Sequence, residues 1–406
     1  MTASLSSVNA PPMSLRRTVL VLGSLSVFGP LSMDLYLPSL PELASHLDTT
    51  DTLAQATMSA CMIGLGLGQL VAGPLSDRIG RKRPLVIGVA LFALLSLACA
   101  LAPTIEVLLV VRYLQGIAGA AGMVVSMAMA RDMFSGPDLS RMLSLLSLVS
   151  ASAPIIAPVI GGQLARVMDW RGIFVVLAGI GAALLVVAVL ALRETLPPDR
   201  RHAGGVRIVA TQFRTLVSDR LFVGVIVVSA FSSTAFFAYL SMSSFVFQNQ
   251  FGVSPAMFSL IFAGNSVALL IGAQINGLVV RRTGPRRMYV VAVSAAAFAS
   301  LGLLGVVLAG WSLVPFIAAL SILMLAQGLS GPNSTTIALH EHGARAGTAA
   351  SVLGTTMFVV GPVVVPLVSL AGVSGLALAA TMSAATLAAA ALVWIAIRPM
   401  LIRPGR

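Results

Sequence analysis

Two charged side chains lie within long apolar stretches of this sequence. Asp34 is the only charged residue between Thr18 and Pro41, and Arg112 lies inside a second apolar stretch. In a bilayer, such a carboxylate costs roughly 2.5 to 3.5 kcal/mol on insertion scales, so it is kept only where it faces a partner, a cavity or a proton path. One proton can neutralise Asp34, whereas a guanidinium stays charged at physiological pH. The pattern predicts proton uptake and release at Asp34 beside a fixed positive charge.

The role of Arg112 has two interpretations at this stage. In the structural one, it neutralises Asp34 in a static ion pair or satisfies the backbone carbonyls of a broken helix. In the functional one, it tunes Asp34 and holds Gln115 and its neighbours in a proton-linked network. Because charged groups are rarely kept idle in membranes, we favour the functional interpretation.

The composition places these residues in a membrane protein. Of 406 residues, 58% are hydrophobic and only 9% are charged, against about 25% charged in an average soluble protein. The apolar residues form twelve blocks of about the length that crosses a bilayer as a helix. The predicted spans are 18–40, 54–75, 84–103, 105–128, 141–164, 172–192, 221–247, 256–279, 288–309, 312–338, 346–370 and 374–397. The expected fold is therefore an all-α membrane protein with twelve transmembrane helices.

The distribution of cations predicts the orientation of these spans. With a cytoplasmic N-terminus, 22 of the 25 Lys and Arg residues fall on the cytoplasmic side, as the positive-inside rule requires. Both termini are then cytoplasmic. Asp34 lies seven residues before Pro41, and Arg112 lies seven residues after Ile105. Both are therefore at a similar depth, roughly 10 Å below the outer edge of their spans.

The same distribution accounts for the net charge of +12. The cations lie in loops at one membrane face without interleaved aromatic residues, so we expect no nucleic-acid partner. The two cysteines, Cys61 and Cys99, both fall within spans and are expected to be small buried apolar groups. No metal-ligand spacing and no cluster of nucleophile, base and orienting residue is visible, so we expect neither a metal site nor an enzyme.

The chain also contains a repeat at an offset of 204 residues. Gly73, Arg78, Gly80, Lys82 and Arg83 correspond to Gly277, Arg282, Gly284, Arg286 and Arg287, and Ala157-Pro158 corresponds to Gly361-Pro362. This repeat predicts two pseudo-symmetric six-helix bundles, 1–192 and 221–406. The polar segment 193–220 is predicted to be a cytoplasmic linker with a short amphipathic helix around 206–216.

Two further motifs predict moving parts. In the loop 73–83, Asp77 can form a contact that exists in one conformation and is lost in another, with Arg131 and Asp132 as natural partners. In span 141–164, prolines bend the helix and glycines permit close packing, so we expect a bent helix at the interface of the two halves. The residues of this bend are Pro154, Pro158, Gly161 and Gly162.

These motifs resemble those of a known family. The segment Gly73 to Arg83 resembles the loop signature of the major facilitator superfamily, and Arg112 to Gly116 and Ala157 to Gly162 resemble its span 4 and antiporter motifs. The runs 33–38, 194–198 and 346–351 resemble the bicyclomycin-resistance-type (Bcr/CflA) drug:proton antiporters. The antiporter motif usually has Gly-Pro where this chain has Ala157-Pro158.

The resemblance implies a function for these positions. Asp34 would bind proton and drug alternately, supported by Arg112 and Gln115, with the proton as coupling ion and no other cofactor. A cytoplasmic latch would involve Gly73, Asp77, Arg78, Gly80, Arg81 and Arg131. A mostly apolar drug pocket would have walls that include Leu31, Tyr36, Met123, Phe236 and Tyr239.

The predicted function is therefore proton-coupled export of small lipophilic drugs, such as bicyclomycin-, phenicol- or sulfonamide-like antibiotics, across a bacterial inner membrane. Because the duplication already supplies both halves of a path, we expect a monomer. An alternative with the same fold is export of an endogenous metabolite, such as a sugar or amino-acid derivative. A receptor or membrane enzyme is a third possibility, which the repeat disfavours.

Overall fold

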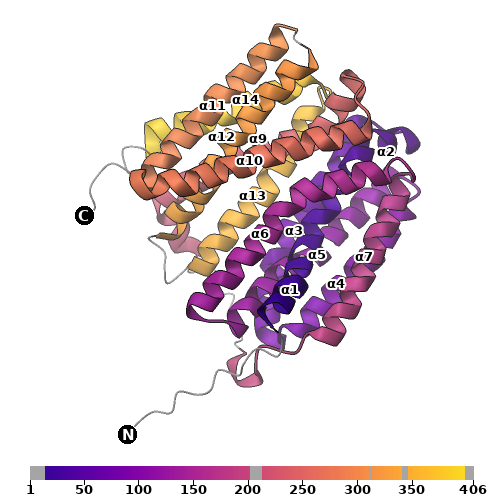
Figure 1. Ribbon diagram of the computed structural model, residues 1–406, viewed down its shortest axis with the longest axis vertical. Coiled ribbons are helices and arrows are strands. Elements are labelled where there is room, and N and C mark those ends of the chain that lie inside the picture. The colour runs from indigo at the N-terminus through magenta and orange to yellow at the C-terminus, as the bar shows by residue number, and fades with distance from the viewer. Residues whose placement is uncertain (1–13, 202–212, 311, 341–345, 398–406) are drawn as a thin grey trace.

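A computed structural model describes residues 14–201, 213–310, 312–340 and 346–397, and every regular element among them is helical (Figure 1). The first half comprises α1 (Leu15–Asp34), η1 (Leu37–Ser39), α2 (Leu40–His46), α3 (Asp51–Ile79), α4 (Lys82–Ala100), α5 (Ile105–Met133), α6 (Gly136–Leu164) and α7 (Trp170–Ala191). The second comprises α9 (Arg220–Phe245), η3 (Val246–Gln250), α10 (Pro255–Thr283), α11 (Pro285–Leu308), α12 (Leu313–His340), α13 (Ala346–Ser369), α14 (Gly375–Leu392) and η5 (Val393–Ile397). A short 3₁₀ helix, η2 (Pro198–Arg200), lies in the segment of the chain that connects the two halves.

The twelve predicted spans are confirmed. Twelve helical segments among the described residues are long and apolar enough to cross a membrane. The first differs in detail from its predicted range of 18–40, because it begins at Leu15 and continues through η1 and α2 to His46. Of the amphipathic helix predicted around 206–216, residues 206–212 lie outside the described residues, and residues 213–218 are helical.

Local sequence signals set several helix ends, and they recur at the same offset in both halves. The Thr50 hydroxyl accepts a hydrogen bond from Leu53 N at the start of α3, and Ser254 does the same for Met257 N at the start of α10. Gly80 and Gly284 follow these two helices with φ angles of 99° and 76°, which disfavour side chains other than hydrogen. An offset of 204 residues carries the bounds of α3 onto those of α10.

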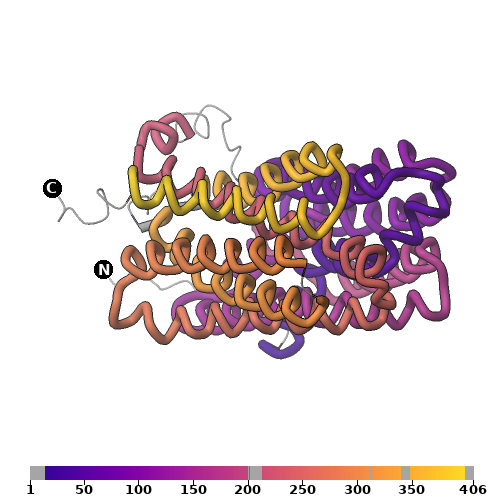
Figure 2. The backbone as a smooth tube through the Cα atoms, turned by 90° about the horizontal axis from the view of Figure 1, so that it is seen from above, coloured from indigo at the N-terminus to yellow at the C-terminus, as the bar shows by residue number. Residues whose placement is uncertain are grey.

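The halves are separate helix bundles that meet along two helix pairs. In the first half α3 packs on α5, α4 on α7, and α1 on α5 and α6. In the second, α11 packs on α12 and α14, α10 on α12, and α9 on α13 and α14. Contact between the halves runs mainly through α3 with α13 and α6 with α10, visible as the boundary between purple and orange helices (Figures 1 and 2).

Hydrogen bonds between the halves gather at one end of the molecule. We call this end, where α2 lies, the distal face, and the end where α1 begins and η5 ends, the terminal face (Figure 1). At the distal face Ser244 donates to the Leu37 carbonyl (2.7 Å) and Gln248 to the Pro38 carbonyl (2.9 Å). Thr52 donates to the Ser369 carbonyl (2.7 Å) nearby. The structure is therefore closed at the distal face.

Candidate functional site

Asp34 is the last residue of α1 and lies where the helix breaks. Pro30 sits inside α1 and cannot donate a backbone hydrogen bond, and the chain turns at Leu35 and Tyr36 before η1 begins. The Asp34 side chain is buried, with only 6% of the residue exposed. Among the described residues it forms no ion pair. The sequence thus places an unpaired carboxylate in the interior at a helix end.

Arg112 occupies the centre of a polar network in the first half. Its Nη1 donates to Gln115 Oε1 at 2.5 Å and lies 3.5 Å from the Ser32 carbonyl oxygen of α1. Gln115 Nε2 in turn donates to Ser96 Oγ of α4 at 2.7 Å. The network therefore links α1, α4 and α5, with the guanidinium fully buried.

Two aromatic rings complete the surroundings of this guanidinium. Arg112 Cζ lies 4.6 Å from the Tyr36 ring centroid and 5.4 Å from that of Phe174, distances at which a cation is attracted to the ring face. The Tyr36 hydroxyl is 2.9 Å from Thr57 Oγ1. Because Thr57 Oγ1 donates to the Ala54 carbonyl, the Tyr36 hydroxyl is the donor in this pair.

The two interpretations of Arg112 can now be compared with its contacts. The static ion pair with Asp34 is not formed among the described residues. Instead Arg112 approaches the Ser32 carbonyl of the broken helix α1, as the structural interpretation allowed, and holds Gln115, as the network interpretation expected. Its position fixes the end of α1 that carries Asp34. Sequence analysis missed Ser32, Ser96 and Thr57, since isolated hydroxyl residues in apolar spans look like ordinary packing residues.

A cavity of about 370 Å³ lies mainly between α9, α10 and α12 of the second half. Its polar lining consists of uncharged side chains, chiefly the hydroxyls of Ser229, Ser232, Ser233, Ser330 and Ser334 and the amide of Gln327. Aromatic and thioether groups of Phe236, Phe237, Met62 and Phe358 supply apolar walls. The lining contains no charged residue.

Of the five residues predicted as pocket walls, Phe236 lines this cavity. Leu31, Tyr36, Met123 and Tyr239 lie outside its lining, and Tyr36 is instead buried in the Arg112 network. Tyr239 is connected to the cavity through Phe236, whose ring centroid is 6.4 Å away. The Tyr239 ring stacks on Phe262 at 5.1 Å. Phe236 thus links the cavity to the stacked rings of Tyr239 and Phe262.

The loop between α3 and α4 forms an ion-pair network at the terminal face. Arg81 pairs with Asp77 at 2.5 Å and, through Nε, with Asp132 of α5 at 2.9 Å. Arg81 Nη1 also donates to Ser76 Oγ. The positive φ of Gly80 turns the chain so that the next side chain, that of Arg81, folds back over the end of α3.

The predicted latch belongs to the conformation closed at the terminal face, so its contact between Asp77 and Arg131 stays a prediction in this structure, which is closed at the distal face. The cation that joins Asp77 to α5 is Arg81, and Asp132 is its partner there; Arg131 is exposed and forms no ion pair among the described residues. Arg78 likewise forms none, and Gly73 accepts a hydrogen bond from Ser76 through its carbonyl. The sequence also predicts that Asp77 closes against the start of span 346–370, around Gly347, when the cavity faces outward, and that contact stays a prediction.

Glu194 anchors the segment after α7 to the same loop. Its carboxylate accepts hydrogen bonds from the backbone N–H groups of Arg81 (2.7 Å) and Lys82 (3.2 Å), which begin α4. It also accepts from Thr195 and Leu196. Burial acts to raise the Glu194 pKa, but these four backbone donors outweigh it and hold the pKa below its usual value. Sequence analysis named Glu194 only as part of a motif.

The predicted bend in α6 lies against α10 of the other half. Pro158 has no N–H, which leaves the Pro154 carbonyl without its helical donor, and Ser266 of α10 donates to that carbonyl at 3.2 Å. A Cβ at Gly161 would overlap the Leu35 carbonyl, and one at Gly162 would overlap Ser259. The four residues therefore allow α6 to pack closely on both α10 and the turn after Asp34. Their part in antiport stays a prediction.

Comparisons with known proteins agree with this geometry. Residues 22–366 match the family described as Major Facilitator Superfamily. The chain is 37% identical over 89% of its length to an uncharacterized MFS-type transporter of Bacillus subtilis, covering 90% of that protein. It is 30% identical over 86% of its length to a bicyclomycin resistance protein homolog of Haemophilus influenzae, covering 88% of it. A chloramphenicol resistance protein of Pseudomonas aeruginosa is 30% identical over 67% of this chain and 64% of that one.

Solved structures share the fold at low sequence identity. The xylose transporter XylE from E. coli, in a partially occluded inward open conformation, superimposes with a TM-score of 0.73 at 13% identity, over 94% of this chain and 98% of that one. A bacterial homolog of the lysosomal transporter Spinster, in an inward-facing conformation, gives a TM-score of 0.72 at 15% identity, over 96% of each chain.

Proposed function

Because the chain belongs to the Major Facilitator Superfamily, we propose that it is a proton-coupled antiporter that exports small lipophilic drugs from the cytoplasm. Members of this family are transporters rather than enzymes, and twelve apolar helices make this chain a multi-pass membrane protein. Relatives named for multidrug, bicyclomycin and chloramphenicol resistance support a drug substrate. Proton coupling is our inference from the site.

Asp34 is the observation that supports coupling most directly. It is a buried carboxylate with no ion pair among the described residues, at the end of a helix that Arg112 holds through the Ser32 carbonyl. A carboxylate in this position can change charge by binding one proton without breaking a salt bridge. The fixed cation of Arg112 does not titrate and so keeps the network in place during the cycle.

The cavity supports an uncharged or weakly polar substrate. Its volume of about 370 Å³ falls in the range of pockets that hold drug-sized ligands. Hydroxyl and amide groups can orient a ligand, while the absence of charge in the lining disfavours an ionic one. We infer that an occupied cavity influences Asp34 through Phe236, which lines the cavity, and its neighbour Tyr239.

The closed distal face supports a cycle of alternating access. With the terminal face toward the cytoplasm, as the cation distribution predicts, the drug enters the cavity from inside and the proton on Asp34 is released there. Closure of the terminal face and opening of the distal face would then release the drug outside and reload the proton. Asp77, Arg78 and Arg131, with the Arg81 network beside them, are proposed to form the latch of the closed terminal face.

Transport in proteoliposomes tests the proposal. Wild-type protein should accumulate a phenicol- or bicyclomycin-type drug against its gradient when a pH gradient is imposed. Asp34→Asn should abolish this uphill transport, and Asp34→Glu should retain part of it. Drug exchange between equal concentrations requires no net proton movement and should persist in Asp34→Asn. Uphill transport by Asp34→Asn at normal expression would overturn the assignment of Asp34.

A second measurement tests the orientation. We propose a bacterial inner-membrane location with the terminal face in the cytoplasm and a monomer as the working unit. Single cysteines at the exposed positions Ser135 and Thr336 should be labelled by an impermeant maleimide only after the membrane is opened. Labelling in intact cells would reverse the orientation.

A further inference from the structure

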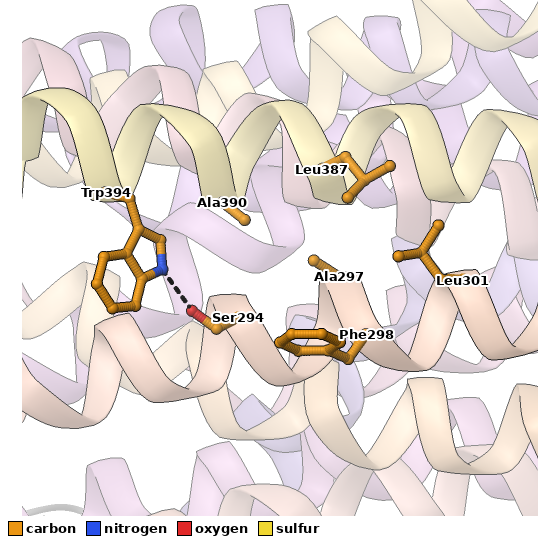
Figure 3. Close-up of a pocket in the computed structure, with 7 residues that line it drawn as sticks. All are labelled: Ser294, Ala297, Phe298, Leu301, Leu387, Ala390 and Trp394. Carbon is orange, nitrogen blue, oxygen red and sulfur yellow. Dashed lines mark hydrogen bonds between the residues drawn. The ribbon is translucent and has the colours of Figure 1, made fainter.

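A groove lies between α11 and α14, on the side of the second half that faces away from the first (Figures 1 and 3). Its volume is about 270 Å³. Ser294, Phe298 and Leu301 line it from α11, and Leu387, Ala390 and Trp394 line it from the α14 side. Apart from Ser294 and the indole N–H of Trp394, these groups are hydrocarbon.

The groove opens toward the membrane and not toward the transport path. Phe298 is 76% exposed and Leu387 41% exposed. The helices that border the groove pack on α9, α12 and each other. An apolar groove on the outer side of a membrane-spanning bundle is covered by hydrocarbon, and an acyl chain has the shape to fill it.

A polar clasp closes one end of the groove. Trp394 Nε1 donates to Ser294 Oγ at 2.9 Å across the gap between the two elements (Figure 3). Trp394 lies in η5, a single wide π-type turn that interrupts regular α geometry at this point, as such turns often do at functional sites. Tryptophan is enriched at membrane interfaces, so the clasp marks the headgroup end of the groove.

A cation stands on the same helix face beyond the clasp. Arg287 precedes Ser294 by two turns of α11, is exposed, and lies near the terminal face. From the terminal face inward, this helix face presents the positive charge of Arg287, then the polar clasp of Ser294 and Trp394, and then the apolar lining of the groove. That order complements an amphiphile with an anionic head and an apolar tail.

We propose that this groove binds an acyl chain of an anionic phospholipid whose phosphate is held by Arg287. The repeat provides an internal comparison. At the offset of 204, Arg83 corresponds to Arg287, but Ala90 replaces Ser294 and Leu190 replaces Trp394. The first half therefore has the cation without the clasp, and the lipid site belongs to the second half.

Fluorescence quenching in vesicles tests the site, with Trp394 as the reporter. Two vesicle preparations have the same ratio of phosphatidylglycerol to phosphatidylcholine, and bromine is carried on the acyl chains of one lipid or the other. Surface charge is then identical, and only the identity of the lipid beside the indole differs. The signal of Trp394 is the part that Trp394→Phe removes.

Brominated phosphatidylglycerol should quench this signal more than brominated phosphatidylcholine, with local enrichment of roughly five-fold, the value of one basic side chain near an anionic surface. Arg287→Gln should remove the preference, and Arg287→Lys should retain it. Arg83→Gln, the counterpart change in the first half, should leave it unchanged. Ala390→Leu should fill the groove and reduce quenching, whereas Ala384→Leu, an exposed position on α14 outside the lining, should not.

Three results would overturn the proposal. Equal quenching by the two brominated lipids would make the groove an ordinary lipid contact without headgroup recognition. Full quenching retained in Ala390→Leu would place the chain elsewhere. Protection of Trp394 from both lipids, together with cross-linking of two protein molecules, would assign the groove to a second copy of the chain.

Discussion

At the residue scale, Gln115 is the side chain whose loss should be most costly in the Arg112 network. It is fully buried, accepts from Arg112 and donates to Ser96. Gln115→Leu leaves the guanidinium and the Ser96 hydroxyl with one partner fewer each, so we expect a loss of about 2 to 3 kcal/mol of unfolding free energy. Thermal unfolding in detergent measures it. Gln163→Leu, which removes an exposed amide, is the control and should change stability little.

The residue scale also shows how far the sequence predicts the site. Asp34, Arg112 and Gln115 could be recognised as polar groups in apolar segments, and Arg112 does contact Gln115. Arg81 was named for the latch by resemblance, but its pairing with Asp77 and Asp132 was not predicted, because the direction of each cation in the loop depends on the φ angle of Gly80. The cavity hydroxyls were missed because serine is common in membrane helices. Ser229 nevertheless lies one helical turn before Ser232 and Ser233, on the same helix α9.

Glu194 permits a prediction about pH at this scale. Its pKa is lowered in the folded protein, so its contribution to stability is present above the unfolded pKa of about 4.3 and is lost as pH falls through the folded pKa. Glu194→Gln should reduce stability at pH 7 by about 1 kcal/mol, the value of a helix cap. Unfolding measured from pH 7 to pH 3 should show the difference between wild type and variant shrinking toward acid pH. A difference independent of pH would contradict the capping role.

At the element scale, close helix pairs depend on glycine. A Cβ at Gly116 of α5 would overlap the Cys61 carbonyl of α3, and one at Gly64 of α3 would overlap the Tyr113 carbonyl. In the second half, Gly272 and Gly328 make the corresponding approach of α10 to α12. Sequence alone showed the glycines but not the opposing carbonyls, because these come from helices more than 40 residues away along the chain.

This packing predicts the effect of adding one methyl group. Gly116→Ala should force α3 and α5 apart and destabilise the first half by about 1 to 3 kcal/mol, the usual cost of overpacking. Gly179→Ala is the matched control, because nothing lies within 4 Å of a Cβ added there in α7. The midpoint of thermal unfolding in detergent reports both. Equal midpoints for the two variants would show that the helices separate without cost.

At the scale of the whole molecule, the repeat supplies symmetry and the charges break it. The bounds of α3 and the turn glycine Gly80 recur at the offset of 204 in α10 and Gly284, and this repeat is why the fold could be predicted from the sequence. Asp34 and Arg112 correspond to Ala238 and Phe316 in the second half. The described structure accordingly places the ionic network in the first half and the uncharged cavity mainly in the second. In the proposed mechanism, coupling therefore passes between the halves.

Movement of the halves gives the last prediction, in which two substitutions act in opposite directions. Gln248 closes the distal face by donating to the Pro38 carbonyl, so Gln248→Leu should favour the conformation open at that face by about two- to ten-fold, the worth of one hydrogen bond. Asp77 is proposed to stabilise the closed terminal face, so Asp77→Asn should favour the conformation open there by about one to two powers of ten. Spin labels at Ser135 and Thr336, one in each half near the terminal face, report the distance across that mouth. Gln248→Leu should enrich short distances and Asp77→Asn long ones. A shift of both variants in the same direction would show that the two faces do not open alternately.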